Sequence, residues 1–247
     1  MRAEGPPLLL IMGIWGGLEA WDPLLGELTG FRTIAFDAPG IGGSELPAFP
    51  QSLVELAGFA AGVLDAVGVR SAHVLGVSFG GLVAQQLAVL APERVERLVL
   101  ASTSAGVLHV PGRLSALLRL LLPWISPSGR QDLGELFGGR IRQQPELVAR
   151  LGLLVPHSLI SHLNRLSGLT GWLGLPWSIR QPTLVLTGDD DPIMPASNSR
   201  ILAACIPRAR LHVVPGGGHL LVFDSPAEVA PLIDAFLRGA DADRRLS

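Results

Sequence analysis

The segment Gly76-Val77-Ser78-Phe79-Gly80 places a serine between two glycines, where an apolar run meets an amphipathic helical pattern. A serine on a tight strand-to-helix turn has a strained backbone that lifts its hydroxyl clear of the sheet, and a Cβ two residues to either side would clash. The turn also directs the N-terminus of the new helix, with the Phe79 N–H, toward an oxyanion beside the serine. The pattern predicts a nucleophile at Ser78, and the alternative is a plain glycine-rich strand exit.

A serine hydroxyl is a poor nucleophile at neutral pH, so the chain must supply a base and a group that orients it. Residues 183–188 predict a buried strand that ends at three adjacent aspartates, residues 189–191. The C-terminal ends of strands are where α/β sheets carry their chemistry. Residues 210–214 predict a further strand, which leads through three glycines to His219. We predict His219 as the general base; any of the aspartates is chemically possible as the acid, and Asp191 is favoured.

Apolar runs alternate with helical patterns along most of the chain, which predicts a parallel sheet with crossover helices. The predicted strands are 8–12, 33–37, 73–77, 97–101, 183–187 and 210–214, and the predicted helices are 53–67, 79–90, 197–205 and 227–237. Residues 106–177 break the alternation, because they are leucine-rich and suggest several short helices. We interpret them as a helical cap inserted into a core domain formed by residues 1–105 and 178–247.

The motifs around Ser78, Asp191 and His219 together resemble the α/β-hydrolase superfamily. Its acid usually lies three residues after a glycine and before a proline, a position that Asp191 occupies here. A closer resemblance, to intracellular medium-chain-length poly(3-hydroxyalkanoate) depolymerases, is carried by residues 34–44, 76–86, 92–101 and 179–186. The superfamily implies a mostly parallel sheet with flanking helices and a cap. Two antiparallel strands usually come first in this fold, and we expect them to be absent because few residues precede the first strand.

The chain departs from the depolymerase pattern beside its nucleophile. That group usually has tryptophan after the serine, where this chain has Phe79, so the substrate stays open. In related hydrolases the second oxyanion donor is the N–H just after the glycine of the first glycine-rich turn, which corresponds to Ile14. Trp15 is the alternative, since a main-chain donor leaves little trace in side-chain identity. The resemblance therefore implies an oxyanion hole made by Phe79 and Ile14.

Composition excludes several other classes of function. The 247 residues suffice for one large α/β domain. A net charge of −2 argues against a nucleic-acid partner, and no cluster of residues has metal-ligand spacing. The single cysteine forms no internal disulfide. The short apolar run near the N-terminus lacks a signal-peptide cleavage site. We therefore expect a cytoplasmic enzyme without a cofactor or a transmembrane segment, in an oligomeric state that the sequence leaves open.

The composition of the cap indicates the kind of substrate. Residues 114–124 make an apolar face too short to span a bilayer, which needs about 20 apolar residues. Some of this face is expected to meet the pocket or an apolar interface; the alternative is that these leucines simply pack the cap onto the core. As pocket residues we predict Trp15, Leu117, Leu121 and Trp124.

These patterns together predict a serine hydrolase that acts on small-molecule or polymeric esters with an apolar acyl or 3-hydroxyacyl part. A polyhydroxyalkanoate depolymerase is one such enzyme. The alternatives are a small-ester carboxylesterase or a C–C bond hydrolase of the same fold. A ligand-binding protein without catalysis is a further alternative, but such proteins usually have a degraded triad.

Overall fold

The computed structural model describes residues 4–14, 16–121, 133–144 and 159–240. Its centre is a six-stranded sheet in the order β2-β1-β3-β4-β5-β6, and every neighbouring pair is parallel. The strands are β1 (Pro7–Ile11), β2 (Arg32–Ala35), β3 (Ala72–Val77), β4 (Val95–Ala101), β5 (Thr183–Gly188) and β6 (Ala209–Val214). The strand order reverses direction at β1, so the chain builds β2 on one side and the later strands on the other.

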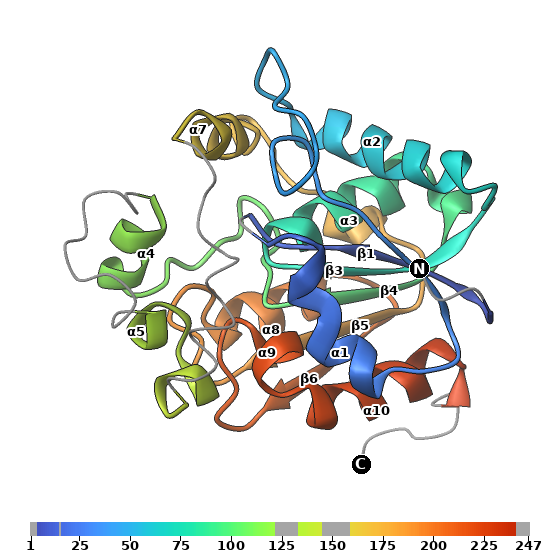
Figure 1. The fold of residues 1–247 in the computed structure, drawn as a ribbon. Helices are drawn as coiled ribbons and strands as arrows, with labels where there is room; N and C mark the ends of the chain where they lie inside the picture. Colours follow the sequence, from blue (N-terminus) through green and yellow to red (C-terminus); the bar gives the residue numbers. More distant parts are fainter. Residues whose placement is uncertain (1–3, 15, 122–132, 145–158, 241–247) are drawn as a thin grey trace.

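Helices cover both faces of the sheet (Figure 1). On one face lie α2 (Leu53–Ala66), α3 (Phe79–Leu90) and α8 (Ala196–Cys205), and on the other lie α1 (Asp22–Glu27), α9 (Leu221–Asp224) and α10 (Pro226–Leu237). Short 3-10 turns flank them at η1 (Leu18–Trp21) and η2 (Pro92–Arg94). Because both faces are covered, the strands are apolar almost throughout, as parallel sheets require.

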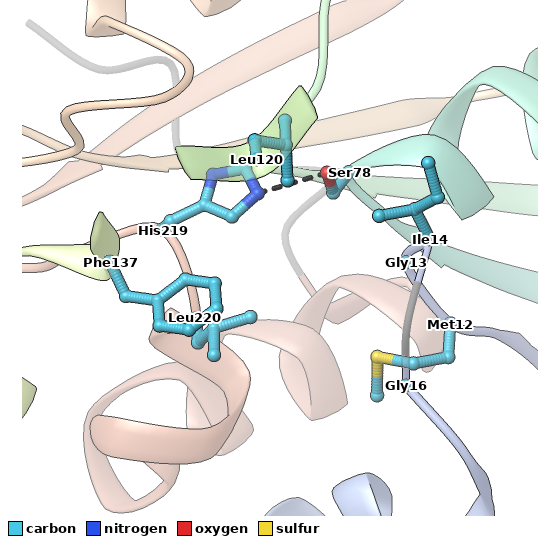
Figure 2. A pocket seen from close by; sticks show the side chains of 9 residues that line it. All are labelled: Met12, Gly13, Ile14, Gly16, Ser78, Leu120, Phe137, His219 and Leu220. Atoms are coloured by element: carbon cyan, nitrogen blue, oxygen red, sulfur yellow. Dashed lines mark hydrogen bonds between the residues drawn. The ribbon is translucent and has the colours of Figure 1, made fainter. Parts of the chain in front are cut away.

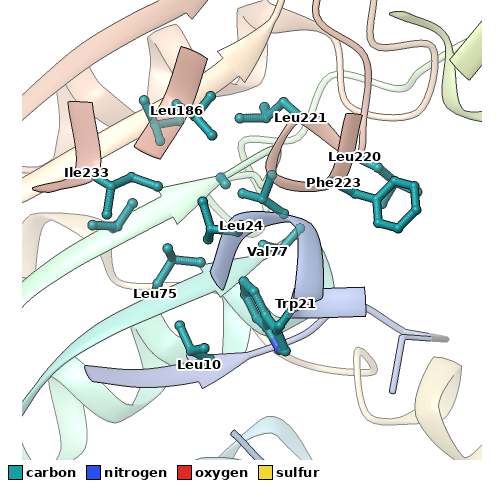
Figure 3. Packing of buried hydrophobic residues seen from close by; sticks show 14 of the residues in the cluster. Leu10, Trp21, Leu24, Leu75, Val77, Leu186, Leu220, Leu221, Phe223 and Ile233 are labelled. Carbon is teal, nitrogen blue, oxygen red and sulfur yellow. The ribbon is translucent and has the colours of Figure 1, made fainter. Parts of the chain in front are cut away.

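The side chains of β1 show how the two faces divide the core. Leu8 and Leu10 pack into the cluster that contains Trp21 of η1, whereas Leu9 packs into the cluster under α2 and α3. Leu10, Trp21 and their neighbours from several elements interdigitate in Figure 3. Burying each such leucine contributes about 1.5 to 3 kcal/mol relative to leaving it exposed. This core fixes the strand ends that carry the functional side chains.

The predicted elements agree with the structure to within one or two residues at their ends. The helix α3 has the predicted bounds, and α2 is capped by Ser52, whose side chain and that of Glu55 form a reciprocal capping box. The sequence interpretation did not include α1 or α9, which have six and four residues. Elements this short show too few turns for apolar periodicity to be visible.

Between β4 and β5 the chain leaves the sheet for a helical segment. The described elements of this segment are α4 (Leu114–Leu121), α5 (Leu133–Phe137), η4 (Gly139–Arg142), α7 (Leu159–Ser167) and η6 (Pro176–Ser178). Figure 1 shows α4, α5 and α7 beyond one end of the sheet, away from the N-terminus. Within the described residues, no helix is both long enough and apolar enough to cross a membrane.

Candidate active site

The turn from β3 into α3 holds Ser78 in a backbone conformation that is rare for a residue with a side chain. Its φ is 54° and its ψ is −120°, outside the regions that L-residues ordinarily occupy. Neighbouring elements hold this conformation, since the Ser78 N–H donates to Ala101 O at 2.8 Å and Thr103 Oγ1 donates to Ser78 O at 2.8 Å. The strain lifts the hydroxyl away from the sheet.

The glycines around Ser78 are required by close packing. A Cβ on Gly76 would lie 2.8 Å from the Cβ of Ala84 in α3. A Cβ on Gly80 would overlap the backbone of Ile11 and Met12 at the end of β1. The motif therefore brings α3 against β3 and β1 more closely than any larger residue permits, which is the physical content of the sequence pattern.

Replacing Gly80 with alanine is expected to destabilise the protein and abolish turnover. The added methyl meets backbone, so overpacking should cost about 1 to 3 kcal/mol or more. Gly62→Ala is the matched control, because Gly62 lies on the exposed side of α2 with open space around it. There alanine should stabilise the helix by about 0.8 to 1 kcal/mol. Thermal unfolding of the two variants checks this; equal midpoints would refute the packing argument.

Three side chains that are far apart in the sequence form one hydrogen-bonded chain. His219 Nε2 lies 2.9 Å from Ser78 Oγ, and His219 Nδ1 lies 2.8 Å from Asp191 Oδ2. His219 and Asp191 are buried, whereas Ser78 is partly exposed. With Nδ1 protonated, the ring donates to the carboxylate and accepts the serine hydroxyl proton at Nε2. This is the geometry of a nucleophile, a base and an orienting acid.

The three aspartates after β5 have three different partners. The Oδ1 atom of Asp191 accepts the backbone N–H groups of Ile193 and Met194 at 2.9 and 2.8 Å, which leaves Oδ2 for His219. Asp190 and Asp189 contact other groups and make no described bond to His219. The structure therefore brings Asp191, and not its neighbours, to the histidine.

The glycine run before His219 fits the chain between two other segments. A Cβ on Gly218 would meet the backbone of Phe137 and Gly138 at the end of α5. The His219 N–H donates to Phe137 O at 2.7 Å, and the two rings lie nearly parallel with centroids 6.3 Å apart. Phe137 therefore positions the imidazole. The sequence interpretation missed this residue, because nothing in a lone phenylalanine of a helical segment indicates which loop it will contact.

A second buried carboxyl lies near the triad. Burial raises the pKa of Asp224 in α9, and the Asp191 carboxylate adds to the rise. Hydrogen bonding by Ser225 and the cation of Arg140 act in the opposite direction. Asp191 is itself held by two backbone donors and the imidazole. The two carboxyls therefore have different environments, and only Asp191 bonds to His219.

A hollow of about 30 Å³ opens beside Ser78 and His219. Its other lining residues come from the first glycine-rich turn, α4, α5 and the loop after His219, and are Met12, Gly13, Ile14, Gly16, Leu120, Phe137 and Leu220. Figure 2 shows their side chains around the serine and imidazole. The lining is almost wholly apolar, and it holds the predicted residue Ile14. The hollow suits the apolar part of a ligand placed next to the nucleophile.

None of the four predicted pocket residues is among the described lining of the hollow. Trp15 and Trp124 lie outside the described residues, as does the side chain of Leu121. Leu117 is half-buried on α4 but is not among the residues that line the hollow, where Leu120 of the next turn stands instead. Leu117 stays a prediction, because an apolar stripe identifies a helix face and not the height along the helix at which it meets a ligand.

No group of histidine, cysteine and acidic side chains in the described part of the chain has a metal-binding arrangement. The family model for the alpha/beta hydrolase fold matches residues 6–226. The chain belongs to the α/β-hydrolase family. The parallel sheet, the flanking helices and the serine turn of this structure are therefore those of an α/β hydrolase.

Known relatives of this α/β hydrolase include enzymes with different reactions. A poly(3-hydroxyalkanoate) depolymerase of Ectopseudomonas oleovorans is 39% identical, over 94% of this chain and 84% of the relative. A 2-hydroxymuconate semialdehyde hydrolase of Pseudomonas sp. strain CF600 is 33% identical, over 96% of this chain and 89% of the relative. The crystal structure of a hydrolase from Pseudomonas aeruginosa PA01 has a TM-score of 0.80 and 33% identity, covering 96% and 91% of the two chains.

Proposed function

We propose that this α/β hydrolase is a serine esterase that cleaves carboxylic esters with an apolar acyl or 3-hydroxyacyl part. The observation that supports it most is the hydrogen-bonded chain from Ser78 through His219 to Asp191, which opens onto an apolar hollow. Activity toward polyhydroxyalkanoate is the specific form that we propose, because a depolymerase of such polymers is 39% identical to this chain.

The geometry supports a two-step acyl-enzyme mechanism. Ser78 Oγ attacks the ester carbonyl carbon while its proton passes to His219 Nε2, and Asp191 stabilises the imidazolium that forms. His219 then gives the proton to the leaving alcohol, and the alcohol departs from the acylated serine. A water molecule, deprotonated by His219, hydrolyses the acyl-enzyme and regenerates the serine hydroxyl. We assign the oxyanion to the backbone N–H groups of Phe79 and Ile14.

The helical segment at residues 106–177 is proposed as the cap over this site. Two of its described residues, Leu120 of α4 and Phe137 of α5, line the hollow together with the nucleophile and base. Both side chains are apolar, so the cap adds to the apolar surface that an acyl chain would contact. The ester substrate thus enters between the cap and the C-terminal ends of the strands.

Turnover of p-nitrophenyl esters of increasing chain length tests this proposal. We expect an optimum at octanoate, because each added methylene that reaches the apolar lining contributes about 0.8 kcal/mol. The same protein should clear a latex of medium-chain polyhydroxyalkanoate, and Ser78→Ala should lose both activities. An optimum at acetate would indicate a small-ester enzyme. Ester turnover without clearing of the latex would refute the polymer substrate and leave the esterase mechanism in place.

A further inference from the structure

One arginine outside the triad is buried in an apolar environment. Arg165, on the cap helix α7, has only 5% of its surface exposed. Its guanidinium carbon lies 5.6 Å from the centroid of the Phe79 ring, in a cation–π contact. Burial lowers the pKa of the guanidinium to about 10, so the group is still charged at neutral pH. A cation is thus held next to the residue that follows the nucleophile.

The guanidinium of Arg165 lacks hydrogen-bond partners at two of its nitrogens. Within the described residues, Nε and Nη2 have no hydrogen-bond partner, and no carboxylate forms an ion pair with them. Removing a guanidinium from water without a partner is costly. A buried polar group without a partner calls for an explanation, and a bound ion or ligand that completes the site is one.

Arg165 is one of the residues that line a second hollow. The other lining residues of this hollow are Ile11, Met12, Phe36, Ala38, Leu56, Phe79 and Val83. Met12 also lines the hollow at Ser78, so the two spaces share a wall. The volume of the second hollow is about 10 Å³, which is room for one small polar end group and not for a whole ligand.

We propose that Arg165 forms an anion subsite that binds a carboxylate carried by the ester substrate at a distance from the scissile bond. One cation in an otherwise apolar space matches a single negative charge, whereas a phosphate would need more donors than the described lining offers. The fork of the guanidinium has the geometry for two parallel bonds to a carboxylate. This subsite rests on the proposed esterase function, because it selects among esters and would favour the free acid end of a hydroxyacid oligomer.

The test compares acidic and neutral esters of equal length. The substrates are the p-nitrophenyl half-esters of the dicarboxylic acids from succinic to suberic, each paired with the p-nitrophenyl ester of the matching monocarboxylic acid. The measured quantity is the ratio of the two kcat/KM values. For the best-fitting length, Arg165→Met should lower this ratio at least about tenfold, the effect of losing charged hydrogen bonds. The ratio for Arg165→Lys should lie between those of the wild type and Arg165→Met, because lysine keeps the charge and loses the two parallel donors of the guanidinium.

A binding measurement separates this proposal from the proposed function. In Ser78→Ala protein, calorimetry compares the Kd of adipate with that of hexanoate, and repeats the comparison with Arg165→Met or Arg165→Lys added. Preference for adipate that depends on Arg165 would support the subsite even if no ester were turned over. Ser78-dependent turnover with ratios that Arg165→Met and Arg165→Lys leave unchanged would overturn the subsite and leave the esterase in place.

Arg200→Met is the matched control for charge. Arg200 is an exposed residue of α8, so its removal takes one positive charge from the protein without touching either hollow. For Arg200→Met, the ratio of kcat/KM for acidic and neutral esters and the preference for adipate over hexanoate should equal those of the wild type. An equal loss in Arg200→Met and Arg165→Met would show a general effect of net charge and would overturn the subsite.

Discussion

Ser78→Ala is expected to lower kcat on p-nitrophenyl octanoate by about 10⁶. The hydroxyl that His219 Nε2 contacts at 2.9 Å is the only group of the described hollow placed to attack a carbonyl carbon. The variant should fold normally, since alanine and serine both carry a Cβ and bear the same strain at a φ of 54°. Stopped-flow or steady-state release of p-nitrophenol checks the loss.

A second serine on the same strand region provides the control. Ser71 precedes β3, and its hydroxyl donates to Glu96 far along the sheet from the hollow. Ser71→Ala should keep the wild-type kcat. Residual turnover in Ser78→Ala equal to that of Ser71→Ala would show that another group is the nucleophile.

Asp191→Asn is expected to lower kcat by about 10⁴. The two backbone N–H groups at Ile193 and Met194 should hold the amide oxygen where Oδ1 now lies. The amide NH₂ would then face His219 Nδ1 and donate to it, which fixes the tautomer that carries its proton on Nε2. That tautomer cannot accept the proton of Ser78. Measured kcat for this variant, with circular dichroism to verify folding, tests the assignment.

The neighbouring aspartates are matched controls for Asp191. Asp190 accepts the Gly139 N–H at 3.0 Å and a hydrogen bond from Arg142 at 2.9 Å, so it ties η4 to the end of β5. Asp189 accepts the Gly216 N–H at 2.6 Å. Asparagine at either position should disturb thermal stability more than kcat. If Asp190→Asn alone abolished turnover, Asp191 would not be the acid.

The sequence predicted the sheet, the flanking helices and the three residues of the hydrogen-bonded chain, because each leaves a local mark. Strands and long helices show apolar periodicity, and the serine turn needs glycines at Gly76 and Gly80 for packing reasons that the structure makes explicit. The order of Ser78, Asp191 and His219 placed all three at the C-terminal ends of strands, where parallel topology brings them together.

The residues that sequence reasoning missed act through contacts between distant segments. Phe137 of α5 contacts the imidazole of His219, which lies in the loop after β6. Leu120 lines the hollow, and Leu117 is not among its lining residues. Arg165 resembles any helical arginine in the sequence, and its significance comes from burial against Phe79. Tertiary packing decides such contacts, and a single sequence carries no periodic or motif signal for them.

The central claim is that Ser78 carries the acyl group during turnover. Rapid acid quenching of wild-type protein with p-nitrophenyl octanoate, followed by mass spectrometry of the peptides, measures it directly. We predict an octanoyl adduct on the peptide that contains Ser78 and none on that peptide in Ser78→Ala. An adduct on another residue, or Ser78-independent turnover with no adduct at all, would contradict the mechanism.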